Sequence, residues 1–510
     1  MLFTIIDCYT DEPAGLGVPP YIGTYPRYIA GAIVDSGHNF VYLTIDDLRF
    51  YHLDSRKKKK LPSEQKTNIK VKNRTVNADI ARILDETDYL IFVAGVHTPG
   101  KYLSAIPGTV AEIKPYIKDL QCFKILTGPV TFGSGLYGGR KAAEVSKEGF
   151  DLVISNLEYK FPLLLENKFS SDIQIDITYP RISNFAVKGA EIVKQLPFPQ
   201  FVVAEIETSR GCSRERGCSF CLEPLKGRPE FREQKEIIDE MIALNKQGIT
   251  KFRLGKQSCI YLYKHTAEEL EKLLKGIHDN VKYEVLHVDN ANPVNVDEEK
   301  TKLIVKYCTE GNVAAFGAES FDANVVSENN LNAKPEQVYE AVKIINKYGA
   351  ERGQNGMPKF LPGINLLFGL KGETKKTNEE NMKWLKRFMD EGLLLRRINI
   401  REVVIFPGTK MAEIGEKILR KNRKMYWKWR NDIRQNIDYP MMQKLIPKAT
   451  VLKNLRTEIH DGNTTFCRQF GTYPLIVGVK ERLELDKIID VEITGHMLRS
   501  AVGKVKAKKE

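Results

Sequence analysis

Residues 201–224 read FVVAEIETSRGCSRERGCSFCLEP, an apolar run of strand length that is followed at once by a cysteine-rich loop. Three of the eight cysteines in the chain, Cys212, Cys218 and Cys221, lie in this loop. Thiolates on one short loop can bind a single metal centre, and iron–sulfur clusters are held by cysteine thiolates. Three protein ligands leave one iron of a four-iron cluster open to a substrate or cofactor. The stretch therefore predicts an iron–sulfur centre at the end of a strand.

Two other interpretations of this loop stay open. A zinc site needs a fourth Cys or His at a suitable spacing. The remaining cysteines are scattered singly, at Cys8, Cys122, Cys259, Cys308 and Cys467. Structural thiols without a metal are the second alternative, which fits poorly with three cysteines in one loop after a strand. We therefore favour the cluster.

Strand and helix patterns alternate around the loop. Residues 196–410 contain six strand patterns, among them KFRLG (251–255) and GINLLFGL (363–370), with amphipathic helical patterns between them. Six such repeats predict an open, partial (β/α)6 barrel. Functional residues on a scaffold of this kind lie at the C-terminal ends of the strands.

The flanking regions predict two further folded units and give a mixed α/β fold class. Residues 1–190 contain continuous apolar runs such as LFTIID (2–7) and YLIFVAG (89–95), which favour the buried parallel sheet of a Rossmann-like domain. Residues 446–503 are rich in β-branched residues and short turns, which predicts a small antiparallel β-barrel. Residues 411–445 form a basic, aromatic helical linker.

Composition narrows the class of protein. The chain has 510 residues, of which 42% are hydrophobic and 28% charged, as in ordinary folded proteins. The cysteines are too sparse for a secreted disulfide framework. The N-terminus lacks the basic region of a signal peptide, and no run reaches the ~18 apolar residues of a membrane span. We expect a cytoplasmic protein without membrane contact.

The positive charge is concentrated near the C-terminus. The net charge is +13, and nine of these excess charges lie in residues 411–510. The segment KNRKMYWKWR (421–430) combines cations, which neutralise phosphates, with aromatic rings, which can stack on bases. The alternative is a solvated amphipathic helix whose aromatic rings lie in a domain interface. The candidate RNA contacts are Arg423, Lys424, Trp427, Lys428, Trp429 and Arg430.

Several motifs in order resemble the radical S-adenosylmethionine (SAM) superfamily over residues 200–410. An aromatic residue, Phe220, precedes the third cysteine, as in that family. The chain differs from the usual C-x3-C-x2-C spacing by having five residues between Cys212 and Cys218. The other matching segments are RLGKQS (253–258), AFGAES (315–320), FGLKGET (368–374) and IFPGTKM (405–411).

The resemblance implies a chemistry. The three cysteines would hold a [4Fe–4S] cluster whose open iron chelates SAM. An electron from a donor such as ferredoxin or flavodoxin would cleave SAM to methionine and a 5′-deoxyadenosyl radical, which abstracts hydrogen from a substrate. The candidate SAM contacts are Phe220, Gly255, Asp289 and Glu319. His287, on the same strand pattern as Asp289, is a weaker candidate.

The domain order resembles that of methylthiotransferases that modify tRNA, which end in an RNA-binding barrel called TRAM. Those enzymes hold a second cluster on three N-terminal cysteines, whereas this chain has only Cys8 and Cys122 before residue 200. Methylthiolation is therefore not inferred. The N-terminal domain also resembles the cobalamin domain of B12-dependent radical enzymes, although the D-x-H-x-x-G motif is absent.

The leading hypothesis is a radical SAM enzyme that modifies RNA, with tRNA as the expected substrate. The chain most resembles a group of uncharacterised archaeal radical enzymes that open with a segment like DEPAGLGVPPYIGTYPRYIAGA (11–32). The enzyme alternative is a cobalamin-dependent radical methyltransferase that acts on a protein or small molecule. The non-enzymatic alternative is an RNA-binding protein with a zinc or structural cysteine loop.

Overall fold

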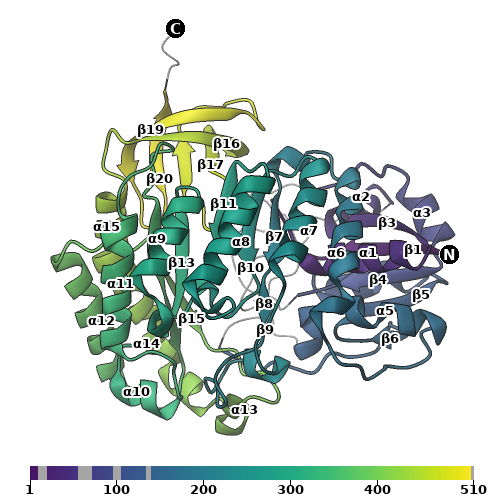
Figure 1. Cartoon of the computed structure of the whole chain (residues 1–510), viewed down its shortest axis with the longest axis horizontal. Coiled ribbons are helices and arrows are strands. Elements are labelled where there is room, and N and C mark those ends of the chain that lie inside the picture. Colours follow the sequence, from purple (N-terminus) through teal and green to yellow (C-terminus); the bar gives the residue numbers. More distant parts are fainter. Residues whose placement is uncertain (10–19, 56–71, 96–104, 134–138, 507–510) are drawn as a thin grey trace.

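A computed structural model describes residues 1–9, 20–55, 72–95, 105–133 and 139–506 (Figure 1). Most of the segment DEPAGLGVPP (11–20) and parts of the loops after the third and fourth long strands lie outside these residues. The N-terminal domain lies at the right of Figure 1, the large barrel at its centre and the small yellow barrel at the top. The predicted mixed α/β fold with a small C-terminal β-barrel is confirmed.

The N-terminal domain is built on a fully parallel sheet in the order β3-β1-β4-β5-β6. Its strands are β1 (Leu2–Asp7), β3 (Asn39–Thr44), β4 (Tyr89–Val93), β5 (Phe123–Thr127) and β6 (Leu152–Val153). Its helices are α1 (Thr24–Asp35), α2 (Ile45–Ser55), α3 (Ile80–Glu86), α4 (Val110–Ile117) and α5 (Leu157–Glu166). Side chains from alternate positions of β1 enter two different cores, so helices cover both faces, as the continuous apolar runs predicted.

The central unit is a partial barrel of six parallel strand positions. They are β7 (Val203–Glu207), β10 (Lys251–Gly255), β11 with β12 (Val285–Val288 and Asn290–Ala291), β13 (Asn312–Glu319), β14 (Phe360–Phe368) and β15 (Arg397–Glu402). Asp289 interrupts the third position. The outer helices are α7 (Gln234–Lys246), α8 (Ala267–Asn280), α9 (Glu298–Tyr307), α10 (Ala323–Glu328), α11 (Pro335–Gly349) and α12 (Lys375–Asp390).

Segments of the N-terminal domain cover both open edges of this barrel. The short strand β2 (Tyr21–Ile22) pairs in parallel with β7. Beyond the end of β15, Gly139 N–H donates to the Val403 carbonyl (3.0 Å) and Ile405 N–H donates to the Arg140 carbonyl (3.1 Å). Because these segments follow β1 and β5, the C-terminal edge of the N-terminal sheet is tied to both sides of the barrel.

The two domains also share one hydrophobic core. Helix α1 packs on α6 (Ser183–Lys188), and α6 packs on α7 of the barrel. Buried residues such as Ile29 of α1 and Met241 of α7 belong to the same cluster. The N-terminal domain is therefore fixed against the barrel by apolar packing rather than tethered by a linker.

The C-terminal region consists of helices and a closed five-strand barrel. The helices are α13 (Lys410–Ile414), α14 (Lys417–Ile433), the π-helical turn η9 (Arg434–Asp438) and α15 (Tyr439–Leu445). The barrel strands are β16 (Val451–Asp461), β17 (Thr464–Arg468), β18 (Ile476–Val479), β19 (Ile488–His496) and β20 (Ala501–Val505). The pairs are antiparallel except for β18 with β20, which is parallel and departs from the predicted all-antiparallel arrangement. Within the described residues no helix combines the length and apolar character that a bilayer crossing requires.

Candidate functional site

The cysteine loop lies at the C-terminal end of the barrel, between β8 (Ser209–Arg210) and β9 (Glu230–Phe231). Ser219 anchors its second half, because its N–H donates to the Asn329 carbonyl and its hydroxyl to the Asn329 side chain, both at 2.9 Å. Met411 N–H donates to the Ser219 carbonyl at 2.8 Å. The loop is thus clamped between the end of α10 and the start of α13.

The unusual spacing between the first two cysteines is accommodated by a second set of contacts. The Arg214 guanidinium donates to the Asn330 carbonyl (2.8 Å) and to the Cys218 sulfur (3.4 Å). The Asn330 amide donates to the Gly217 carbonyl (3.1 Å). A Cβ on Gly217 would lie 2.1 Å from Cγ of Pro224, so only glycine fits there. The longer segment between Cys212 and Cys218 is therefore held in place by hydrogen bonds and close packing.

The thiols lie close enough to influence one another electrostatically. Burial raises the pKa of Cys218 to about 11, and Glu319 and Cys212 add to the increase. Burial likewise raises the pKa of Cys221 to about 12, with contributions from Glu223, Cys218 and Cys212. The raised pKa values disfavour ionisation of Cys218 and Cys221 without a bound cation, and metal binding draws off such protons.

This donor set fits a cluster. Over the described ranges, no group of three His, Cys, Asp or Glu side chains converges as the ligands of a single ion do. A cluster takes each thiolate on a different iron, so its three sulfur ligands need not meet at one point.

Polar side chains line the inner face of β13, β14 and β15 near this loop. Asn365 and Asn399 keep partial exposure and share a hydrogen bond of 3.2 Å, whereas their neighbours Ile364 and Ile400 are buried under the outer helices. Glu319 lies at an irregularity at the end of β13 with φ of +60°. Burial raises the pKa of Glu319 to about 8, while Arg401 opposes the increase. Because its carboxylate contributes to the raised pKa of Cys218, Glu319 lies beside the cysteine loop.

Gly255 and Phe220 occupy positions around the same end of the barrel. Gly255 ends β10, and a Cβ there would lie 2.7 Å from the Glu205 carboxylate. The next residue, Lys256, has φ of +56°, and its ammonium group lies 3.8 Å from the Tyr25 ring centroid. Phe220 is half-buried and packs with Cys218 against a cluster of apolar residues under α13.

Asp289 has partners that the sequence did not suggest. Its side chain is fully buried, forms an ion pair with Arg253 and accepts a hydrogen bond from the Tyr473 hydroxyl at 2.9 Å. Arg253 also binds Glu205 at 2.9 Å. Tyr473 belongs to the loop between β17 and β18 of the small barrel, so Asp289 joins two domains.

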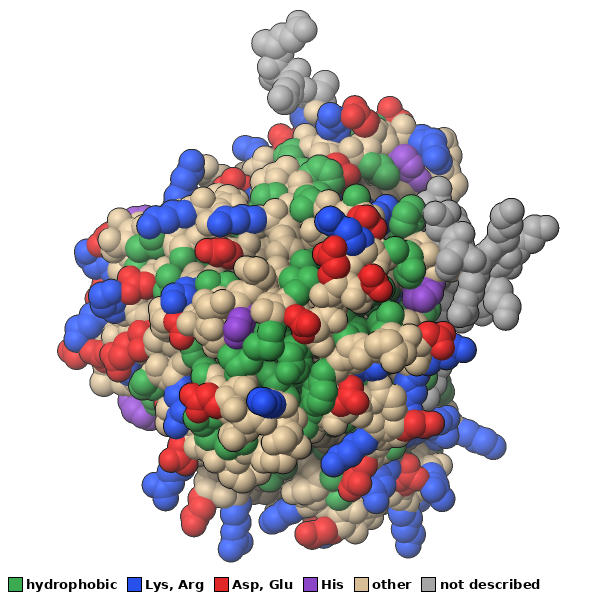
Figure 2. Space-filling view, turned by 90° about the vertical axis from the view of Figure 1, so that its right-hand side faces the viewer, with side chains coloured by type: hydrophobic (Ala, Val, Ile, Leu, Met, Phe, Trp, Pro, Cys, Tyr) green, Lys and Arg blue, Asp and Glu red, His purple; other side chains and the backbone are tan. Residues whose placement is uncertain are grey.

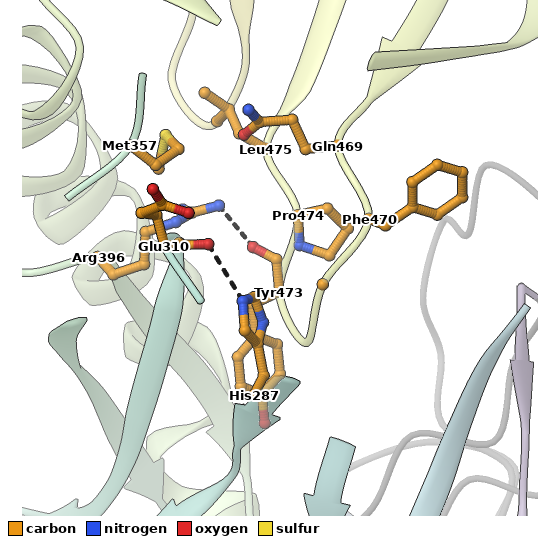
Figure 3. A pocket seen from close by; sticks show the side chains of 11 residues that line it. His287, Glu310, Met357, Arg396, Gln469, Phe470, Tyr473, Pro474 and Leu475 are labelled. Atoms are coloured by element: carbon orange, nitrogen blue, oxygen red, sulfur yellow. Dashed lines mark hydrogen bonds between the residues drawn. The ribbon is translucent and has the colours of Figure 1, made fainter. Parts of the chain in front are cut away.

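His287 contacts the same loop, which joins β17 to β18 (Figure 3). Its Nε2 donates to the Glu310 carbonyl (3.1 Å), and its Nδ1 accepts from Thr472 N–H (3.1 Å). Burial lowers the pKa of His287 to about 4, which keeps the ring neutral. Residues 469–475 thus fill the N-terminal end of the barrel. Sequence reasoning missed this insertion, since QFGTYPL shows only the Gly and Pro of an ordinary turn.

The candidate RNA contacts divide into two groups on α14. Arg423, Lys424 and Lys428 are exposed, and Trp427 is 59% exposed with Arg430 5.3 Å from its ring centroid. Trp429 is only 3% exposed and packs on Phe368, so the prediction that it stacks on RNA is wrong. On the face in Figure 2, which is the side of the N-terminal domain, basic and acidic side chains are interspersed.

Comparison with known proteins agrees with this architecture. The family model described as "Radical SAM superfamily" matches residues 206–385. A protein of Methanocaldococcus jannaschii is 41% identical, over 98% of this chain and 92% of that protein.

Two named relatives are more distant. The ribosomal protein uS12 methylthiotransferase RimO of Phocaeicola vulgatus is 26% identical over 36% of this chain and 41% of its own length. The tRNA-2-methylthio-N(6)-dimethylallyladenosine synthase of Buchnera aphidicola is 22% identical over 61% of this chain and 73% of its own length.

A solved structure extends the likeness beyond the central barrel. The radical SAM methyltransferase TsrM of Kitasatospora setae, with cobalamin and a [4Fe-4S] cluster bound, covers 81% of this chain and 75% of its own. The TM-score is 0.51 at 16% identity, which shows a shared fold. The non-enzymatic alternative is therefore set aside. The chain, like its relative in Methanocaldococcus jannaschii, belongs to the radical SAM superfamily, and it is an enzyme.

Proposed function

We propose that this radical SAM enzyme modifies RNA, with tRNA as the substrate. The observation that carries the RNA assignment is the outer face of α14, where exposed cations surround the exposed ring of Trp427. The name of one relative refers to tRNA and that of another to a ribosomal protein. The positive charge of α14 favours the nucleic acid, because phosphates are the common target of such clusters.

The proposed reaction centre is the cysteine end of the barrel. Cys212, Cys218 and Cys221 would hold the [4Fe–4S] cluster that the superfamily implies, with SAM against Gly255, Phe220 and Glu319. When bound, the reduced cluster and SAM supply an organic radical that abstracts hydrogen. The clamp of Ser219 on Asn329 and Met411 would fix the loop, and a ferredoxin or flavodoxin would deliver the electron. Asp289 is left out, because its carboxylate is already paired with Arg253 and Tyr473.

The RNA assignment is tested by tRNA binding to the full-length holoenzyme. Removing a stacking ring costs ~1–3 kcal/mol per base, so Trp427→Ala is expected to weaken binding about 5- to 150-fold. Lys424→Ala with Lys428→Ala is expected to reduce the slope of log K against log salt by about 1.4–1.8, if each lysine meets one phosphate.

The matched control is Lys383→Ala with Lys386→Ala, which removes two exposed charges from α12. This control should leave both tRNA affinity and the salt slope unchanged. Equal loss in the control, or wild-type protein that fails to bind tRNA, would refute the assignment. Mass spectrometry of total tRNA and protein from a strain without the gene would then identify the modified molecule.

A second candidate function is cobalamin-dependent methyl transfer, and one specific observation favours it. In an open parallel sheet with the order of β3-β1-β4-β5-β6, ligands bind outside the strand ends where the order reverses, between β1 and β4. The segments that follow β1 and β5 run to the two edges of the barrel, so this edge of the sheet is turned toward the barrel.

Anaerobic purification from cells supplied with cobalamin tests this candidate. About one cobalamin per chain, read from the absorption spectrum, is the expected result. Protein that binds none, either on purification or after reconstitution, would contradict it. The RNA assignment does not depend on whether cobalamin binds. An enzyme that methylates RNA and an enzyme that only abstracts hydrogen from RNA would both need the basic face of α14 to bind the substrate.

A further inference from the structure

Arginines from three elements gather at the start of β15, the last strand of the partial barrel. Arg396 and Arg397 lie at the start of the strand, Arg434 on the turn η9, and Arg499 on the hairpin between β19 and β20. The Arg434 guanidinium donates to the Ile398 carbonyl at 2.7 Å, which brings η9 across the strand. The hairpin is fixed nearby because His496 Nε2 donates to the Ile446 carbonyl at the end of α15 (2.7 Å).

The loop from the small barrel completes the arrangement. The Arg396 guanidinium donates to the Tyr473 carbonyl at 2.5 Å, as Figure 3 shows. The Arg397 guanidinium lies 4.0 Å from the centroid of the Tyr473 ring. The cluster therefore sits where the barrel, the basic helical region and the C-terminal barrel meet.

Carboxylates do not balance these charges. Arg434 pairs with Asp438, but in the part of the chain that the structure describes no carboxylate lies within 4 Å of Arg396, Arg397 or Arg499. Burial lowers the pKa of Arg396 to about 10, and repulsion from Arg397 and Arg499 adds to the decrease. Arginine otherwise stays protonated at a far higher pH. Asp289 acts on Arg397 and Asp438 acts on Arg499 only from beyond 4 Å, so positive charge exceeds negative charge in the cluster.

Two buried hydrogen-bond donors in the cluster also lack acceptors. Nε of Arg396 and Nε of Arg434 are buried without a partner among the described residues. The two residues are only 8% and 6% exposed. Buried donors are nearly always paired, so each unpaired one calls for an explanation. An anion rich in oxygen atoms would supply the missing acceptors, and guanidinium groups match phosphate in particular.

The cluster is open to solvent on one side. Arg499 is exposed, and its neighbours Met497 and Leu498 are 57% and 37% exposed. The turn η9 continues directly from α14, whose outer face carries the exposed cations and Trp427. Turns of the π-helical kind are frequent at functional sites. A polyanion lying on α14 would reach the cluster without leaving the protein surface.

We propose that Arg397, Arg434 and Arg499 form a phosphate-binding site that holds one phosphodiester of the RNA substrate. This inference rests on the proposed function in RNA modification. The site anchors the strand between the basic face of α14 and the barrel, so it sets the register in which a nucleotide enters the barrel. Arg396 is held beside these three residues by its hydrogen bond to the Tyr473 carbonyl, and its unpaired Nε would donate to the same phosphodiester.

The test measures tRNA binding by Arg499→Gln and by Arg397→Gln in the full-length, anaerobically purified holoenzyme. The matched control is Arg482→Gln, which removes an exposed arginine from the same small barrel near the opposite end of β19. Each test variant is expected to weaken binding about five- to tenfold and to reduce the salt slope by about 0.7–0.9. The control should stay within about twofold. Circular dichroism establishes that each variant is folded, and Arg499→Gln, at an exposed position, keeps the test valid if Arg397→Gln unfolds.

The outcomes separate this inference from the proposed function. If the variants bind tRNA as the wild type does, while the lysine variants of α14 lose affinity, the phosphate site is refuted and the RNA function stands. If only a nucleoside monophosphate binds in a manner that depends on Arg499, the phosphodiester assignment is refuted. If wild-type protein binds no tRNA, the proposed function fails. In that case, inorganic phosphate that raises the Tm of wild type but not of a variant carrying both Arg397→Gln and Arg499→Gln would still support the anion site.

Discussion

The two ends of the partial barrel are built in opposite ways. At the C-terminal end, three half-buried thiols, of which Cys218 and Cys221 have raised pKa values, lie beside Glu319 and a face of partly exposed polar side chains. At the N-terminal end, residues 469–475 fill the opening, and His287, Asp289 and Tyr473 have matched hydrogen-bond partners. The end that carries the chemistry keeps its thiols and polar side chains partly exposed. The other end uses its polar groups to fasten a domain, as expected for the two faces of such barrels.

The largest effect is expected at the cysteine end. Cys218→Ser should abolish cluster binding and reduce the production of 5′-deoxyadenosine from SAM to background, because a cluster thiolate is lost. Iron and sulfide analysis together with product chromatography measure this. Cys122→Ser, which changes a half-buried single cysteine, should keep about four iron atoms per chain. If the Cys218→Ser protein retained its iron, Cys218 would not be a cluster ligand. The cysteine end would then no longer differ from the filled end as the site of the chemistry.

The next effect concerns pH at the filled end. His287 has a pKa of about 4 in the folded protein, against about 6.5 when unfolded, so only the unfolded chain takes up this proton between those values. Stability should therefore fall as the pH falls from about 6.5 to about 4, by ~3 kcal/mol in total. In His287→Gln this part of the pH dependence should vanish. Denaturant unfolding at several pH values compares the two proteins, and equal slopes would contradict the assignment.

A smaller loss is expected from Tyr473→Phe. The change removes the hydroxyl that donates to Asp289 and leaves a buried carboxylate with one partner fewer. Hydrogen bonds to charged groups contribute ~1.5–3 kcal/mol, so unfolding should become easier by about that amount. SAM cleavage should persist, because the cysteine end is untouched. Lost cleavage in a folded variant would show that the two ends are coupled.

The smallest effect is expected from Arg214→Ala. This side chain holds the longer segment of the cysteine loop on the Asn330 carbonyl, a bond worth ~1 kcal/mol. Iron content should stay unchanged, because Ser219 still anchors the loop to Asn329 and Met411. Iron analysis after repeated desalting measures this. Loss of iron would mean that the inserted segment is part of the metal site itself.

The aromatic residues of α14 lie where the helical period of the sequence places them. Leu419, Asn422, Tyr426, Trp429 and Ile433 form the buried side of the helix at spacings of three and four. This is the period of an α-helix, so the pattern predicts that Trp429 is buried. Trp427, two positions earlier, falls on the exposed side. The alternative of an amphipathic helix with aromatic rings in a domain interface therefore holds for Trp429, whereas Trp427 stays on the exposed face.

Sequence by itself determined the cysteine loop, the alternation of strands and helices, and through them the fold and the superfamily. These signals are local, because ligand spacing and strand-length apolar runs are read within a few tens of residues. Only the tertiary structure decided that Asp289 accepts a hydrogen bond from Tyr473 and that residues 469–475 fill the N-terminal end of the barrel. It also decided that arginines from β15, η9 and the β19–β20 hairpin meet. Such contacts join residues up to about two hundred positions apart. They follow from how the packed domains meet, which no local pattern encodes.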